Sequence, residues 1–397
     1  FPTRRSSDLI MARYIQSAGG IYAFIERGLG KNIAFFTSMA YIIYLFAVIM
    51  VLYFIFALMV PTGFSELGIN LPSWIWIPFG IINALVSSTI SYIGVRPSLR
   101  FTITMSIIEM AAIIGTSILI FSKVPPDPNT FTLAYVPSPK ISNLGLAVAF
   151  GVLAFTGYET TSVLGEEAVD PKSNIAKGVF TAALLVGITY ITASEAFTVG
   201  WGVNNMSTFY QYLAPGLILA KTYGGYALVI ILTVLVINSC ITSVVGFTNA
   251  VSRVMYAMSR DDLLPSFFNS IHPTRRTPYK AVLFSFIFSA AYYVIMSLLF
   301  TPENMYIATG ITSTFGFLIG IFTVNLSMII VLKKAHALSL GHLILVSIVE
   351  AVISYVFYAT IITSAINVPV LIGVLTLVTW VIGGSIYLGL KKRKSTL

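Results

Sequence analysis

Charged residues are scarce in this chain. Only 9% of its 397 residues are Asp, Glu, Lys or Arg, whereas 57% are hydrophobic. A soluble domain carries about 25% charged residues, so the composition excludes a soluble fold. It predicts instead an all-α integral membrane protein whose main partner is the lipid bilayer.

Cysteine and histidine are also nearly absent. The single cysteine, Cys240, excludes an internal disulfide and a cysteine-based metal cluster. The three histidines, His272, His336 and His342, lie in or beside expected loops, so we expect no metal site. A phosphate-binding loop, a metal-ligand cluster and a Ser–His pair are missing as well. We therefore expect neither an enzyme nor a cofactor, and no nucleotide-driven transport.

Long apolar runs dominate what is present. A bilayer-spanning helix needs roughly 20 mostly apolar residues. We predict ten complete spans, at about 33–60, 74–94, 101–122, 143–168, 178–200, 226–258, 281–300, 305–332, 342–363 and 366–390.

The first residues do not fit this pattern. Residues 1–9 resemble the translation of a sequencing-library adapter, so we expect a non-native leader there. Residues 10–394 then form the membrane domain, and residues 9–26 have the character of the end of an earlier span. We expect the native protein to extend further upstream.

Basic residues fall mainly on one side of the membrane. If the loop before residue 33 is cytoplasmic, 18 Lys and Arg residues lie on that side and 3 on the other, outside the leader. This bias predicts a multi-pass plasma-membrane protein with a cytoplasmic C-terminus. It also explains the net charge of +9 without any binding of nucleic acid.

The predicted span at 143–168 is interrupted in its middle. A glycine, Gly157, and a carboxylate, Glu159, stand where lipid would surround an ordinary helix. Broken backbone at that depth survives only where protein covers it or where it lines a watery cavity. The interruption therefore indicates a ligand site inside the membrane. The alternative is a kinked structural helix with an aromatic packing stripe.

Three motifs resemble one family. SAGGIY at 17–22 is similar to the stretch after the second helix of amino acid permeases of the amino acid–polyamine–organocation (APC) superfamily. GYE at 157–159, with the acidic residues that follow as far as Asp170-Pro171, resembles the sixth helix and next loop of that family. SRVMYAMSRD at 252–261, with Leu264-Pro265, resembles the loop after the eighth helix.

The resemblance implies a leucine-transporter-like fold: two inverted five-helix repeats plus two C-terminal helices. The complete spans would be helices three to twelve, so we expect the first helix, with its glycine-rich break, to be missing from this chain. The implied function is a secondary active transporter for an amino acid, proton-coupled or exchanging, working by alternating access. The alternative is a non-transporting membrane receptor or subunit on the same fold.

The resemblance also suggests which residues contact the substrate. A broken helix leaves carbonyl groups at the end of its first half and N–H groups at the start of its second half, and these attract the two charges of a zwitterion. We place the break at 155–159. We expect Phe155 and Tyr158 to pack on the amino acid, and Thr156 and Gly157 to contact it through the backbone.

Glu159 and Tyr44 are less certain members of this site. We expect Glu159 to bond the unwound backbone, contact the substrate amine or take part in gating, and structural support of the break is its alternative role. Tyr44 of the third helix is expected to face the site.

Glu109 is the candidate for proton coupling. It lies nine residues past Arg100, about 13 Å deep at 1.5 Å per residue, with no Lys or Arg at a similar depth in any span. The cost of an unpaired charge there favours the protonated acid. We expect Glu109 to carry H⁺ as the coupling ion; the alternative is a structural hydrogen bond to a neighbouring helix. Some proton-coupled relatives have a lysine at about this point.

Other polar residues within the spans are expected to be structural. Glu350 is expected to stabilise helix packing or an oligomer contact, and Glu195 to be wet near the outer end of its span. Four residues of the eighth helix either bind an ion or, as we expect, form hydrogen bonds between helices. They are Asn238, Ser239, Thr242 and Ser243.

Overall fold

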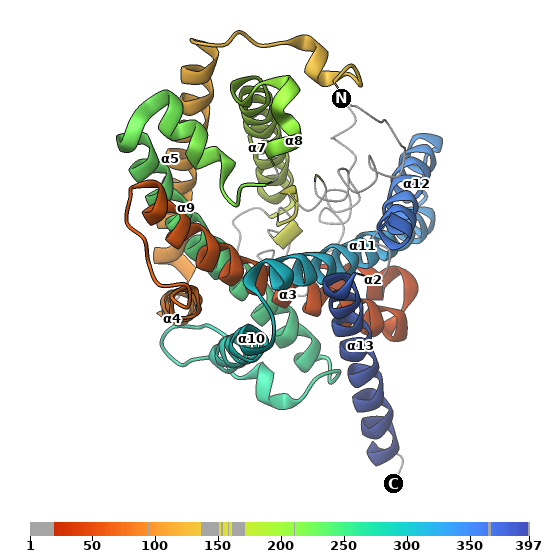
Figure 1. The fold of residues 1–397 in the computed structure, drawn as a ribbon. Coiled ribbons are helices and arrows are strands. Elements are labelled where there is room, and N and C mark those ends of the chain that lie inside the picture. The colour runs from red at the N-terminus through yellow and green to blue at the C-terminus, as the bar shows by residue number, and fades with distance from the viewer. Residues whose placement is uncertain are drawn as a thin grey trace.

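The computed structural model describes residues 20–93, 95–135, 151, 154–157, 159–160, 171–209, 211–363 and 367–395. Within these ranges every regular element is a helix and none is a strand, as Figure 1 shows. The predicted all-α membrane fold is therefore confirmed.

Nine helices of the described residues are long and apolar enough to cross a membrane. They correspond to nine of the ten predicted spans, and most of the tenth, 143–168, lies outside the described residues. The elements containing them are α3 (Lys31–Glu66), α4 (Trp76–Ile93), α5 (Val95–Phe121), α7 (Pro171–Trp201), α9 (Pro215–Arg260), α10 (Tyr279–Leu299), α11 (Pro302–Lys334), α12 (Leu340–Thr363) and α13 (Val368–Ser395).

Helix α3 is the centre of the bundle. Most of its apolar residues are buried, and it packs most extensively against α11 and α9. Figure 1 shows α5 and α7 to one side of this centre and α12 and α13 to the other. A helix that is hydrophobic all round belongs in a core, which is where α3 lies.

The contact between α3 and α11 depends on Gly316. A Cβ atom at this position would lie 2.6 Å from the Ala40 carbonyl oxygen and 2.8 Å from the Tyr44 Cβ. Only glycine allows such a close approach of two helices. The absence of a side chain at residue 316 thus sets the spacing at the middle of the bundle.

Helix α9 has a sharp kink at Gly225. This residue has φ 68° and ψ −168°, so the segment before it diverges from the long apolar run that follows. The predicted span at 226–258 begins directly after the kink. The segment of α9 before the kink is linked to the end of α3 by an ion pair between Lys221 and Glu66, with Nζ and Oε2 3.2 Å apart.

The two C-terminal helices are attached to this core by polar bonds. The Trp380 indole of α13 donates to the Met39 carbonyl oxygen at 3.0 Å. The Asn325 side chain of α11 donates to Glu350 Oε1 of α12 at 2.8 Å. Glu350 therefore makes a helix–helix contact, as expected from the sequence.

The loop after α5 folds back onto α7 through Glu195. Its Oε1 accepts a hydrogen bond from the Asp127 backbone N–H at 2.8 Å, and its other oxygen accepts from the Thr130 hydroxyl. Glu195 is only 7% exposed. The expectation of a wet side chain was wrong, because the loop covers the end of the span.

Asp127 is also hydrogen-bonded within its own loop. The Tyr135 hydroxyl donates to its carboxylate, and so does the Asn129 backbone N–H. These bonds, the Tyr135 bond first, hold the pKa of Asp127 below its ordinary value. The hydrogen bonds of this loop therefore favour the ionised form of Asp127.

Candidate functional site

The backbone leaves the helical conformation at the predicted break. Ala154 is helical, Phe155–Gly157 form a turn, and residues 159–160 have a 3-10 conformation. The Gly157 carbonyl oxygen accepts from the Thr160 N–H at 3.1 Å and from the Thr160 hydroxyl at 2.6 Å. A tight turn therefore replaces the α-helical ladder here.

Gly157 has a backbone that other residues avoid. Its φ of +106° lies in the left-handed region, where a side chain brings strain. A Cβ atom would also stand 3.2 Å from Cζ of Phe247 on α9. The turn thus requires glycine, and the packing leaves little room for a side chain.

Glu159 links this turn to α3. Its Oε2 accepts from the Gly157 N–H at 2.8 Å, and its Oε1 accepts from the Tyr44 hydroxyl at 2.6 Å. Glu159 is 1% exposed and Tyr44 is 0% exposed. In this geometry the carboxyl group bonds the unwound backbone to α3.

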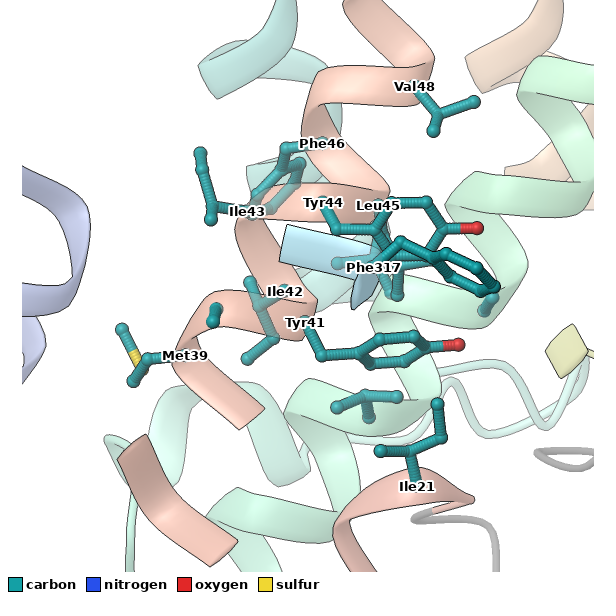
Figure 2. Packing of buried hydrophobic residues seen from close by; sticks show 14 of the residues in the cluster. Ile21, Met39, Tyr41, Ile42, Ile43, Tyr44, Leu45, Phe46, Val48 and Phe317 are labelled. Carbon is teal, nitrogen blue, oxygen red and sulfur yellow. The ribbon is translucent and has the colours of Figure 1, made fainter. Parts of the chain in front are cut away.

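Aromatic rings surround Tyr44. Phe317 of α11 lies 5.3 Å from it between ring centroids, Tyr41 also lies at 5.3 Å, and Phe247 packs edge-on at 6.2 Å. Figure 2 shows Tyr41 and Tyr44 extending to the same side of α3, with Phe317 beside Tyr44. Phe247 and Phe317 were not predicted, because nothing in an all-apolar helix marks which face will meet a distant segment.

The other predicted substrate residues do not share the buried surroundings of Tyr44 and Glu159. Phe155 is 40% exposed and packs edge-on against Tyr190 of α7, with ring centroids 5.4 Å apart. The Tyr190 hydroxyl donates to the Ala154 carbonyl oxygen at 3.0 Å. Thr156 lies in the turn, partly exposed, and Tyr158 lies outside the described residues.

Glu109 lines a cavity of about 200 Å³ beside the break. Thr160 and Phe247 line the same cavity, so it adjoins the turn at Gly157. The Asn238 side chain of α9 donates to Glu109 Oε1 at 2.6 Å. The structure thus places Glu109 in a cavity that adjoins the break, although α5 and the break are separate in sequence.

Three hydroxyl-bearing residues of α9 line this cavity as well. Ser239, Thr242 and Ser243 are among its lining residues. The Thr242 hydroxyl donates to the carbonyl oxygens of Asn238 and Ser239, at 3.0 and 3.2 Å. Asn238 therefore makes a helix–helix hydrogen bond of the kind that we expected, whereas these two bonds of Thr242 stay within its own helix.

Two of the sequence motifs meet at the basic side of the molecule. The Tyr22 hydroxyl, at the start of α2 (Ile21–Leu29), donates to Asp261 Oδ2 at 2.8 Å. Tyr22 ends the first motif and Asp261 ends the third, 239 positions away. The acidic residues that follow the GYE motif, Glu166, Glu167 and Asp170, lie outside the described residues.

Comparison with known proteins gives several similar transporters. An uncharacterized transporter of Rhizobium meliloti (strain 1021) is 28% identical over 214 residues, which cover 52% of this chain and 44% of that protein. The branched-chain amino acid permease BcaP of Bacillus subtilis (strain 168) is 25% identical over 292 residues, covering 69% of this chain and 60% of BcaP. The methylthioribose transporter of the same organism is 25% identical over 262 residues, covering 66% of this chain and 52% of that transporter.

The chain thus spans about half the length of these relatives. The profile of one family, described as Amino acid permease, matches residues 9–389. That match includes α3, the break at Gly157 and the loop after α9. Since it takes in nearly all of the sequence, the chain belongs to the amino acid permease family.

Proposed function

We propose that this protein is a secondary active transporter that moves an amino acid or a close derivative across the plasma membrane. The observation that carries the proposal is the helix interruption at Gly157, which Glu159 holds against α3. Unwound backbone at mid-span offers main-chain dipoles to a small zwitterion. The names of BcaP and of the family support an amino acid as the substrate.

Within this proposal, Phe155, Thr156, Gly157 and Tyr158 contact the substrate, and Glu159 and Tyr44 keep the turn in place. Alternating access then moves helices around a turn that is itself held fixed. The basic residues near α2, the α9 loop and the end of α13 support a cytoplasmic C-terminus.

Uptake into liposomes tests the transport proposal. The reconstituted protein is given labelled leucine, valine or alanine, and labelled methylthioribose serves as a substrate of different chemistry. We expect uptake of at least one amino acid above empty liposomes. Amino acid binding in a thermal-shift assay without any uptake would support a receptor instead.

We further propose that Glu109 carries the coupling proton. It is a membrane-embedded carboxyl group whose cavity adjoins the break, and its hydrogen-bond partner Asn238 is neutral. Glu109→Gln removes the titratable proton while keeping the shape and the bond from Asn238. We expect this variant to lose uptake driven by a pH gradient and to retain exchange of internal for external substrate.

Glu350→Gln is the matched control, because Glu350 is also a carboxyl group in a predicted span with an asparagine partner, Asn325. We expect Glu350→Gln to keep pH-driven uptake. If Glu109→Gln transports with unchanged pH dependence, the coupling role of Glu109 is wrong, while the transport proposal remains.

A further inference from the structure

A groove between α4 and α10 plays no part in the proposed transport site. Its volume is about 200 Å³, and its lining is mainly apolar, with Leu85, Tyr92, Leu283 and Phe286 among the residues. Leu85 is 51% exposed and Leu283 is 47% exposed, so the groove opens on the outer surface of the bundle. In a membrane, such a surface faces acyl chains.

One end of the groove carries an arginine in a fixed position. The guanidinium carbon of Arg275 lies 4.7 Å from the centroid of the Tyr92 ring. Its Nη1 donates to the Tyr92 carbonyl oxygen at 3.3 Å. A guanidinium group has five N–H donors, so this bond leaves most of them for an anion.

The turn that contains Arg275 is fixed by its own hydrogen bonds. The His272 N–H donates to the Thr277 carbonyl oxygen at 2.8 Å, and the Arg276 N–H donates to the His272 carbonyl oxygen at 3.0 Å. The His272 ring also packs edge-on against Tyr92, with centroids 5.9 Å apart. Arg275 is therefore positioned before any ligand arrives, which lowers the entropic cost of binding.

The charge around this end of the groove is positive and uncompensated. Arg276 is exposed beside Arg275, and Lys280 follows in the first turn of α10. Within the described part of the chain, none of these three residues forms an ion pair with a carboxylate. They also lie on the side that we expect to be cytoplasmic, where anionic lipids are concentrated.

We propose that the groove is a binding site for an anionic phospholipid. One acyl chain lies along the apolar lining between α4 and α10, and the lipid phosphate accepts hydrogen bonds from Arg275. Bulk lipid would fill the groove without selecting a head group; the fixed arginine at its end is what adds selectivity for a negative charge.

Native mass spectrometry tests this proposal without requiring transport. The purified protein is titrated with phosphatidylglycerol and, separately, with phosphatidylcholine, and the retained lipid is counted. We expect preferential retention of phosphatidylglycerol. Arg275→Gln should weaken that retention about fivefold, the factor that corresponds to roughly 1 kcal/mol per basic residue at a membrane surface.

Two further variants separate the site from general surface charge. Lys334→Gln removes one exposed positive charge from the expected cytoplasmic side, outside the groove, and should leave retention unchanged. Thr89→Trp fills the groove without changing charge and should lower retention of both lipids. Equal losses in Arg275→Gln and Lys334→Gln, or full retention in Arg275→Gln, would overturn the proposal.

Discussion

Gly157 and Glu159 act together at the residue scale. The glycine adopts a φ of +106°, and the carboxyl group two residues later accepts its N–H. The same carboxyl group accepts from Tyr44, so the turn is bonded both within itself and to α3. A single substitution can remove either bond and so test its contribution.

Replacing Gly157 by alanine should damage the site. We expect about 1–3 kcal/mol of destabilisation from backbone strain, together with a loss of uptake of at least tenfold, because Phe247 must also move. Thermal unfolding and liposome uptake measure the two effects. Gly151→Ala is the matched control in the same segment, since a Cβ there meets nothing within 4 Å. Equal behaviour of the two variants would contradict this prediction.

The bond between Tyr44 and Glu159 should appear as coupling between two substitutions. A typical hydrogen bond contributes about 0.5–1.5 kcal/mol, and a buried group that loses its partner costs about 1–3 kcal/mol. Tyr44→Phe and Glu159→Gln should therefore each destabilise the protein, and their effects should not add. Chemical unfolding of the two single variants and the double variant measures this.

Tyr53→Phe gives the comparison for this cycle. Tyr53 lies on the same helix, is 1% exposed and packs edge-on against Tyr293. Combined with Glu159→Gln it should give additive losses. Additivity in the Tyr44 pair as well would mean that the bond has no energetic role.

At the element scale, the sequence predicted where helices lie along the chain better than it predicted which helices contact each other. Length and apolar content were enough to place nine spans, and a glycine with a carboxylate in mid-span was enough to place the break. The pairing of Glu109 with Asn238, 129 positions away, was not predictable. Helices that are apolar on all sides have no periodic pattern from which a contacting face can be read.

Glu195 illustrates the same limit. Its position near the end of α7 suggested contact with water, but the loop from α5 folds over it. Glu195→Ala should remove the acceptor of the Asp127 N–H and raise amide hydrogen exchange in residues 127–135 about tenfold or more. Mass spectrometry of exchange measures this effect.

Thr198→Ala provides the reference for the loop experiment. Among the described residues, the Thr198 hydroxyl bonds only along its own helix, to the Ser194 carbonyl oxygen at 2.7 Å. It should leave exchange in the loop unchanged. Exchange rates that stay low in Glu195→Ala would show that other contacts anchor the loop.

At the scale of the whole molecule, the basic residues predict which way the bundle crosses the membrane. The only cysteine, Cys240, is 3% exposed, so engineered cysteines can be labelled against a low background. We expect Lys334→Cys to react with a membrane-impermeant maleimide only after cells are opened, and Thr132→Cys to react in intact cells. The reverse pattern would invert the topology.

The close approach at Gly316 has a consequence for how the molecule changes shape. Because no side chain separates α11 from the α3 backbone there, any sliding of one helix along the other would drive bulky neighbours into the contact. We expect these two helices to travel as a single rigid piece. The displacement that opens one face of the membrane and closes the other must then come from the looser helices around them.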